Sequence, residues 1–347
     1  MESGVEIVRG DTPGLEWRIP VLRFRGGRPG APSAYLQAGL HGDEMPGVAT
    51  AHALAGRLRA AEAQGAILGD VTLVPVANPI GASQFLFGAH MGRYDLGSRV
   101  NFNRGHPVLD RPDKARLIGD DAAAPADERL KARLVSLALD ADIVLDLHCD
   151  DEALPYLYIH AALWPQMADL AAALGADAVL TWDGDGGRAF EEAALAPHLA
   201  DAAGLVRRAV STVELRGVAD VTSAYAEADA DGLMRFLAGR GVVAGPGPEA
   251  GWAGLVAPLE HVEMVRAPAG GVVVFAVEPG APVREGDLVA TILTRPGEPD
   301  GALDVHAPQA GLVLTRRSLR VVRGGDDLLK IVGSRASPTA KPGPLEQ

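Results

Sequence analysis

The sequence contains a single cysteine, Cys149, among 347 residues. With one thiol no disulfide can form within the chain, which fits a reducing compartment. The chain also lacks a basic N-terminal segment followed by an apolar stretch, so no signal peptide is expected. It has no apolar run of about 18 residues, so no transmembrane helix is expected either. These absences predict a cytoplasmic protein that has no membrane partner.

Positive charge is also scarce in this sequence. Lysine and arginine together number 32 against 45 acidic residues, which gives a formal charge of −13. Nucleic-acid binding needs a basic face, so this balance argues against a nucleic-acid partner. Apolar residues make up 48% of the chain, enough for a sizeable core, and the length favours two domains. Acidic enzymes with a small β domain often self-associate, so a homo-oligomer is compatible with the sequence.

The stretch 34–58 organises the rest of the chain. It starts with a short apolar strand, continues through a turn that carries His41 and Glu44, and enters a helix at Pro46. An imidazole and a carboxylate three residues apart, between a strand and a helix, can face one point where a zinc ion could bind. The alternative interpretation is that Asp43 caps the helix beside a surface histidine and glutamate.

A third candidate ligand follows a second apolar strand. Residues 143–147 form this strand, and His148 lies at its end. A catalytic zinc takes three protein ligands and keeps one position for water. His41, Glu44 and His148 would supply such a set for one zinc ion per chain. Asp146 lies two residues before His148, points to the same face of the strand, and is a candidate to fix the histidine tautomer.

Several further motifs occur in a fixed order along the chain: HGDE at His41 to Glu44, ANP at Ala77 to Pro79, GRY at Gly92 to Tyr94, NFNR at Asn101 to Arg104, DLH at Asp146 to His148, and TVELRG at Thr212 to Gly217. The ordered set resembles the succinylglutamate desuccinylase/aspartoacylase family, relatives of the zinc carboxypeptidases, over nearly the whole chain. In that family the fourth motif usually reads Asp-x-Asn-Arg. This chain has Asn101 in place of the aspartate, which bears on the local support of Arg104.

The resemblance and the pattern of elements imply an α/β fold in two parts. The first is a mixed-sheet, zinc-carboxypeptidase-like hydrolase domain over residues 1–245, in which alternating strands and helices cover a sheet on both faces. The second is a small all-β barrel-sandwich domain over residues 255–333. A flexible tail is expected over residues 334–347.

The expected β domain contains an internal repeat. VRAPAGGVV at residues 265–273 is echoed by VHAPQAGLV at residues 305–313, which suggests two similar halves. The region resembles biotinyl and lipoyl carrier domains, whose carrier lysine would fall near Glu263. No lysine is there, so a structural or substrate-shaping role is expected instead of a swinging arm.

Other residues are candidates for chemistry at the zinc. Glu214 ends an apolar strand, and a carboxylate near a metal can take a proton from water and pass it to a leaving amine. Its alternative is a solvated glutamate at a strand end. The long loop at residues 79–107 is typical of a functional segment. Within it, the resemblance assigns stabilisation of the oxyanion to Arg93, with Arg99 as the competitor.

The same resemblance assigns a substrate carboxylate to Asn103 and Arg104, since the arginine fork can donate two parallel hydrogen bonds. Cys149 is not expected to act as a nucleophile with His148, because adjacent strand residues point to opposite faces. The acidic run at residues 150–152 is interpreted as solvated surface, or as a feature that favours a substrate with an amine group.

The sequence therefore predicts a zinc-dependent amidohydrolase. Its expected substrate is a small N-acyl amino acid or related N-acyl amine, and its reaction is hydrolysis of the non-peptide amide bond. Two alternatives stay open at this point. One is a metallocarboxypeptidase that acts on small peptides, and the other is a metal-free binding protein on the same fold.

Overall fold

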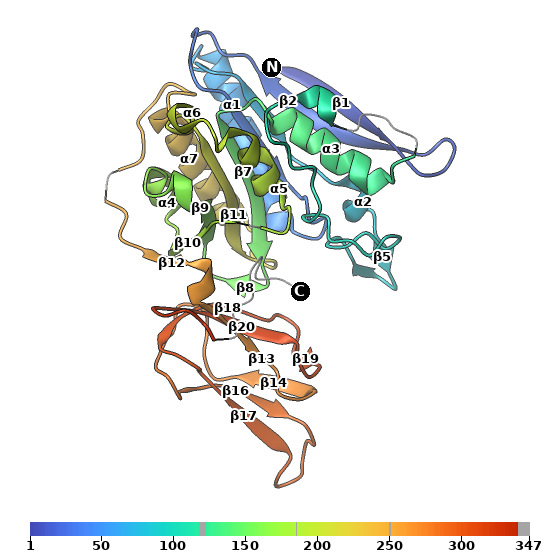
Figure 1. Cartoon of the computed structure of the whole chain (residues 1–347), viewed down its shortest axis with the longest axis vertical. Helices are drawn as coiled ribbons and strands as arrows, with labels where there is room; N and C mark the ends of the chain where they lie inside the picture. The colour runs from blue at the N-terminus through green and yellow to red at the C-terminus, as the bar shows by residue number, and fades with distance from the viewer. Residues whose placement is uncertain (118–122, 185, 250, 339–347) are drawn as a thin grey trace.

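The structure, a computed structural model, describes residues 1–117, 123–184, 186–249 and 251–338. Its main body is a nine-stranded mixed sheet (Figure 1). The strands follow the order β1 (Glu2–Arg9), β2 (Glu16–Phe24), β4 (Val71–Val74), β3 (Ala34–Ala38), β7 (Ile143–Asp150), β11 (Ala209–Gly217), β9 (Tyr156–His160), β10 (Ala178–Trp182) and β12 (Leu255–Pro258). Most of the tail expected from residue 334 falls outside the described residues.

The centre of the sheet is parallel and buried. Strands β4, β3, β7 and β11 run in the same direction, and β11 pairs with β9 in the antiparallel sense. Every residue of β3 and nearly every residue of β7 and β11 is buried. Such strands are covered on both faces, so their sequences are continuously apolar apart from the functional positions. Their carboxyl ends meet at one edge, which carries His41, His148 and Glu214.

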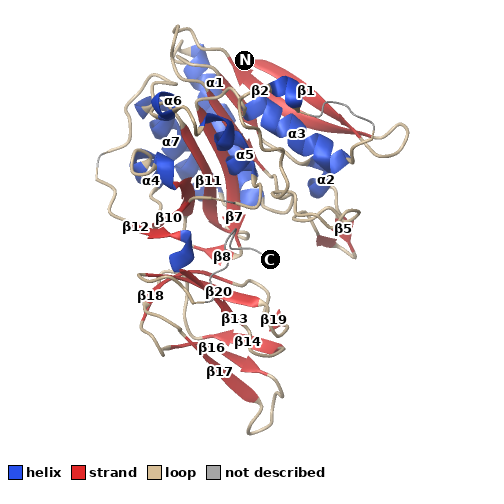
Figure 2. Ribbon diagram, in the orientation of Figure 1, coloured by secondary structure: helices blue, strands red, loops and turns tan. Residues whose placement is uncertain are grey.

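Helices cover both faces of this sheet (Figure 2). Helix α1 (Met45–Ala63) packs with α7 (Ser223–Gly239), and α4 (Ala168–Leu174) packs beside α7. Helices α3 (Ala126–Ala138) and α5 (Phe190–Leu195) lie on the opposite face (Figure 1). The remaining short elements are α2 (Pro79–Ala82), α6 (Ala202–Leu205), the hairpin β5 (Phe85–Leu86) and β6 (Ala89–His90), and the 3₁₀ turns at Lys114–Arg116, Ala161–Leu163, Ala196–His198 and Leu259–His261. Among the described residues, no helix is both long enough and apolar enough to cross a lipid bilayer.

Residues 262–333, called here the C-terminal β segment, form two antiparallel sheets. One contains β13 (Val262–Arg266), β20 (Asp327–Gly333), β18 (Gly311–Arg316) and β15 (Pro282–Val283); the other contains β17 (Ala302–His306), β16 (Leu288–Leu293), β14 (Gly271–Phe275) and β19 (Val321–Val322). Each copy of the sequence repeat crosses from one sheet to the other, as β13 to β14 and as β17 to β18. The equivalent valines Val265 and Val305, and Val273 and Val313, all lie in the apolar core between the sheets.

The position at which a carrier domain would have its lysine is Glu263. Its side chain is 4% exposed, and the residue pairs with Ile331 inside the sheet. A buried position within a strand is a poor attachment point for a swinging arm.

The C-terminal β segment is joined directly to β7, which carries His148 and continues to Asp150. Beyond β7, the short strand β8 (Glu152–Ala153) pairs with β18. Three polar contacts add to this pairing: Lys330 Nζ donates to Asp150 at 2.5 Å, Ser318 Oγ donates to Asp151 at 2.6 Å, and Glu152 accepts from Arg316 and Arg320. The expectation of a solvated acidic surface is therefore only partly met: Asp151 is exposed, Asp150 and Glu152 are half-buried, and all three have hydrogen-bond partners. The acidic run at residues 150–152 provides the counter-charges at the junction with the C-terminal β segment.

Candidate metal centre

The turn before α1 directs a histidine and a glutamate to the same point. Glu44 occupies the N-cap position in an extended conformation, and its side chain makes no capping hydrogen bond. Asp43 is not the cap, so the alternative interpretation of this turn is wrong. Gly42 donates its backbone N–H to Gly92 O at 2.8 Å, and a Cβ at either glycine would lie 2.2 Å from a backbone nitrogen of the facing segment. The absence of side chains thus lets the loop that carries Arg93 pack against the turn.

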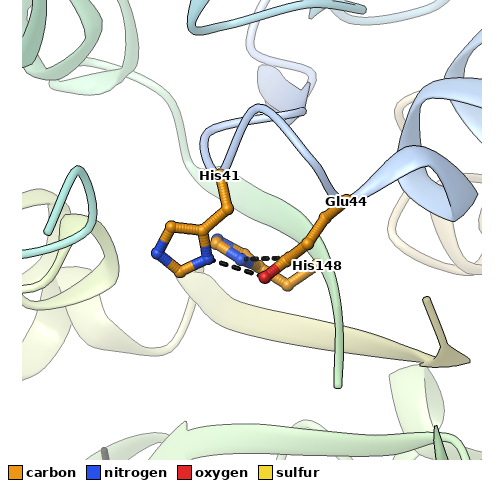
Figure 3. A group of neighbouring side chains, drawn as sticks. All are labelled: His41, Glu44 and His148. Atoms are coloured by element: carbon orange, nitrogen blue, oxygen red, sulfur yellow. Dashed lines mark hydrogen bonds and ion pairs between the residues drawn. The ribbon is translucent and has the colours of Figure 1, made fainter. Parts of the chain in front are cut away.

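His41, Glu44 and His148 converge in a buried cluster (Figure 3). Glu44 Oε1 lies 2.7 Å from Nδ1 of His41, and Glu44 Oε2 lies 2.9 Å from Nδ1 of His148. One ligand atom from each residue can be chosen so that all three lie within 4.8 Å of one another. Each of the three residues is at most 5% exposed. These are the three residues selected from the sequence, and together they can hold a metal ion.

The outer nitrogen of each imidazole is hydrogen-bonded away from the cluster. Nε2 of His148 lies 2.8 Å from Asp146 Oδ2, as the strand spacing predicted. Nε2 of His41 lies 2.8 Å from Asn101 Oδ1. Because each Nε2 faces an acceptor oxygen, each Nε2 carries a proton. Nδ1 is then the ring nitrogen available to a metal in both histidines.

The charges of the cluster oppose the effect of burial. Burial alone would raise the pKa of Glu44, but the two histidines hold that pKa well below its usual range. Burial would lower the pKa of His148, but Asp146 and Glu44 raise it well above its usual range. A metal ion competes with protons for such ligands, so binding of a metal at this cluster would release protons and would weaken as the pH falls.

Glu214 lies on β11 directly beside His148 of β7. It is 7% exposed, and its Oε2 has no hydrogen-bond partner among the described residues. Burial raises the pKa of Glu214 well above its usual range; His148 and Lys330 oppose this rise, and Glu44 and Asp150 add to it. A raised pKa makes this carboxylate a better proton acceptor than a solvated glutamate, which is a property of a general acid–base group.

Arg93 and Arg99 were the two candidates for stabilising the oxyanion, and Arg93 is the one that contacts the cluster. Its Nη1 donates to Glu44 Oε1 at 2.8 Å and lies 3.1 Å from His41 Nδ1. Arg99 is exposed, with a positive φ of 62°, in the turn that links Asp95 to Val100. A cation therefore stands at the edge of the metal cluster.

Asn103 and Arg104 lie outside the cluster of three candidate ligands, but both are hydrogen-bonded to Asn101, which contacts His41. Oδ1 of Asn103 accepts the backbone N–H of Phe190 at 2.8 Å, which fixes the segment to the start of α5. The backbone N–H of Asn103 donates to Asn101 Oδ1, the same oxygen that faces His41. Arg104 is half-buried and donates from Nη1 to its neighbour's carbonyl at 2.6 Å. Both residues are thus connected to the cluster through Asn101.

Cys149 does not have the properties of a nucleophile. It is buried, and burial raises the pKa of its thiol, so the thiolate is disfavoured. Its backbone N–H donates to Glu44 Oε2 at 3.0 Å, which helps to hold the carboxylate in the cluster.

A cleft of about 270 Å³ is lined by Arg93, which contacts Glu44, and its walls come from both parts of the chain. Arg93, Tyr94 and Asp150 line one side, and Thr315, Arg317 and Lys330 line the other. Sequence reasoning did not identify Lys330, which is separated from Asp150 by 180 residues. It also did not identify Tyr156, whose hydroxyl donates to Asp150 at 2.8 Å. The alternation of Tyr156 and Tyr158 on one strand was the only available signal.

Comparisons with known proteins identify the family and the shared fold. The model of the succinylglutamate desuccinylase/aspartoacylase catalytic domain matches residues 30–240. A crystal structure of a protein assigned to that family from Shewanella amazonensis SB2B is 26% identical, with a TM-score of 0.84, over 96% of this chain and 98% of that chain. A counterpart from Shewanella frigidimarina NCIMB 400 is 25% identical, with a TM-score of 0.82, over 96% and 97%.

A more distant match, at 21% identity and a TM-score of 0.73, covers 96% of this chain and 95% of the ectoine utilization protein EutE (DoeB) from Ruegeria pomeroyi, and it shows the shared fold. No curated protein sequence matches the chain. The family's two named activities, removal of succinyl and aspartate-linked acyl groups, are deacylations, which hydrolyse amide bonds. The match to the catalytic-domain model spans more than half of the chain, and the chain therefore belongs to the succinylglutamate desuccinylase/aspartoacylase family.

Proposed function

We propose that the protein is a zinc-dependent deacylase that hydrolyses the amide bond of a small N-acyl amino acid or a related N-acyl amine. The observation that carries this proposal is the buried cluster of His41, Glu44 and His148 in a member of this family. Two imidazole nitrogens and one carboxylate form the ligand set of many catalytic zinc sites. A zinc ion held by these residues would polarise the scissile carbonyl and activate a water molecule.

The other residues act on protons and on charge. Glu214 accepts the proton of the attacking water and returns it to the leaving amine, since its raised pKa suits both steps. Arg93 donates hydrogen bonds to the oxygen that becomes negative when the amide is attacked. Its reach to Glu44 supports this role, because a substrate carbonyl at the cluster would lie within range of the same guanidinium.

Binding of the substrate falls to the segment beyond Asn101 and to the cleft. Arg104 receives a carboxylate beside the scissile amide in a bidentate pair, with Asn103 as its neighbour. The cleft between Arg93 and the C-terminal β segment holds the remainder of the substrate. The C-terminal β segment thereby shapes the substrate site.

The first experiment is metal analysis of the purified protein. We expect about one zinc per chain, loss of activity after chelation, and its recovery when zinc is added back. His41→Ala should lose metal and activity together. His52→Ala removes an exposed histidine from α1 and should change neither, which makes it the matched control. Full zinc occupancy in the His41 variant would refute the ligand assignment.

The second experiment separates the proposed deacylase from its alternatives. A panel of N-acyl amino acids is compared with dipeptides under the same zinc-loaded conditions. Faster hydrolysis of the N-acyl amino acids supports the deacylase, and faster release of C-terminal residues supports a carboxypeptidase. A protein that binds these compounds without metal and without turnover would be a binding protein on the same fold.

A further inference from the structure

The two imidazoles of the cluster are supported by acceptors of different charge. Asp146, which is fully buried, accepts from Nε2 of His148 through a carboxylate oxygen. Asn101, which is 6% exposed, accepts from Nε2 of His41 through an amide oxygen. Both distances are 2.8 Å. The two supports therefore match in geometry and burial, and they differ by one negative charge.

The orientation of the Asn101 amide follows from a second neighbour. The backbone N–H of Asn103 donates to Asn101 Oδ1 at 2.8 Å, and a backbone N–H can only donate. The atom that faces His41 is therefore the acceptor oxygen rather than the amide nitrogen. Nε2 of His41 must then carry a proton, and Nδ1, which lies 2.7 Å from Glu44 Oε1, is the ring nitrogen that faces the other two ligands.

A charged acceptor strengthens an imidazole ligand more than a neutral one does. A carboxylate attracts the Nε2 proton strongly and raises the electron density at the opposite nitrogen, whereas an amide oxygen orients the ring with a weaker effect. We propose that Asn101 is the positioning residue of His41 and that its neutral amide makes His41 the weaker of the two imidazole ligands. This proposal rests on the metal site of the proposed function.

The test exchanges charge between the two supports and measures zinc affinity by competition with a chelator. Asn101→Asp supplies a carboxylate while keeping an oxygen for the Asn103 N–H, and zinc binding should tighten about tenfold or more. Asp146→Asn should weaken it about tenfold to a hundredfold. The double variant exchanges the two acceptors, so its affinity should return toward that of the wild type.

The matched control separates the hydrogen bond from the general field of an added charge. Asn103→Asp places a carboxylate two residues away, where the oxygen accepts the Phe190 N–H instead of a histidine proton. Its gain in zinc affinity should be much smaller than that of Asn101→Asp. Equal affinities in the two variants would overturn the proposal.

A second measurement needs no variant that could fail to fold. Nitrogen-15 NMR of the histidines in the zinc-loaded wild type identifies which ring nitrogen bears the proton. Both Nε2 protons should be visible, and that of His148 should lie further downfield because its acceptor is charged. Coordination of His41 through Nε2 would overturn the proposal. Failure of the wild type to bind any metal would instead overturn the proposed function.

Discussion

Glu44 and Glu214 are both buried glutamates beside His148, yet their pKa values are shifted in opposite directions. Burial would raise the pKa of Glu44, but two histidines in contact with it lower that value. Burial raises the pKa of Glu214, and the negative charges of Glu44 and Asp150 raise it further. Oε2 of Glu214 has no hydrogen-bond partner among the described residues. Two carboxylates whose environments separate their pKa values divide the work of a site, one as a permanent anion and one as a proton carrier.

Replacement of Glu214 tests this division. Glu214→Gln keeps the shape of the side chain and removes its basicity, so zinc and substrate should still bind while kcat falls by a factor on the order of 10² or more. Zinc content, substrate Kd and kcat are measured on the same preparation. Glu260→Gln, at an exposed position in the junction, serves as the control. Turnover close to that of the wild type would assign the base to another residue.

Arg104 provides a test of the substrate class. Arg104→Lys keeps the charge but loses the bidentate fork, so affinity for a substrate carboxylate should fall with the zinc site still loaded. A charged hydrogen bond is worth about 1.5–3 kcal/mol, or roughly a tenfold to hundredfold change in affinity. The comparison uses one substrate as its acid and as its neutral amide. The wild type should bind the acid more tightly than the amide, and the variant should lose that preference. Equal affinity of the wild type for the two compounds would mean that Arg104 is not a carboxylate receptor.

The residues that could be identified from sequence alone share one property. His41, Glu44, Asp146 and His148 lie within two short motifs, so local spacing on a turn or a strand places them. The hydrogen bond from His41 to Asn101 could not be foreseen, because it joins residues 60 apart through the path of a loop. Asn101 was visible as a departure from the family pattern, but the expectation attached it to Arg104 rather than to His41.

At the scale of secondary-structure elements, the distance between Glu44 and His148 depends on how closely α1 approaches β7. Gly47, in the first turn of α1, sits against Leu147 of β7. A Cβ at this glycine would lie 2.7 Å from the Leu147 carbonyl oxygen and 3.0 Å from the Leu147 Cβ. The absence of a side chain therefore lets the helix that follows Glu44 pack against the strand that carries His148.

Substitution of this glycine should separate the two elements. Gly47→Ala improves helix propensity, but the contact with backbone forces a shift that should cost about 1–3 kcal/mol of unfolding free energy and weaken zinc binding. Gly56 lies in the same helix with nothing within 4 Å of its ideal Cβ. Gly56→Ala should be stabilising by about 0.5–1 kcal/mol with no effect on zinc. Thermal unfolding and chelator competition measure both; a Gly47 variant that behaves like the Gly56 variant would contradict this account.

Long periodic elements were predictable from the sequence, and short ones were not. The strand at residues 34–38 has the expected bounds. The helix begins one residue before Pro46 and continues to Ala63, five residues beyond the expected apolar pattern that ended at Leu58. The loop at residues 79–107 contains α2 and the β5–β6 hairpin, which are too short to show a period. Helix α2 forms because Asn78 caps it through Gly81 N, and the same asparagine donates to Leu40 O in the turn before His41.

At the scale of the whole molecule, the C-terminal β segment acts on the electrostatics of the metal centre. Lys330 of β20 pairs with Asp150, two residues after His148, and its charge lowers the pKa of Glu214. The repeat sequence indicated a β domain of two halves, but it gave no sign of this contact. Sequence patterns describe each part separately, whereas the junction depends on how the two parts meet.

Removal of this charge should alter the pH dependence of the reaction. Lys330→Met removes a cation and leaves Asp150 without its partner ammonium, and both changes raise the pKa of Glu214. A base works only when deprotonated, so the acid limb of kcat/KM should move to higher pH. Lys114→Met, which breaks a surface pair with Asp140, should leave the profile in place. An unchanged or lower acid limb in the Lys330 variant would mean that the two charges are not coupled.

The junction also has a consequence for the order in which the protein matures. Glu152 and Arg316 are 164 residues apart in the chain. Synthesis at about 5–20 residues per second therefore leaves the acidic run without its basic partners for roughly 8–33 s after it leaves the ribosome. During that interval the carboxylates of residues 150–152 have none of the partners that they contact in the folded chain. The pairs of Glu152 with Arg316 and of Asp150 with Lys330 can therefore form only after the C-terminal β segment has been synthesised.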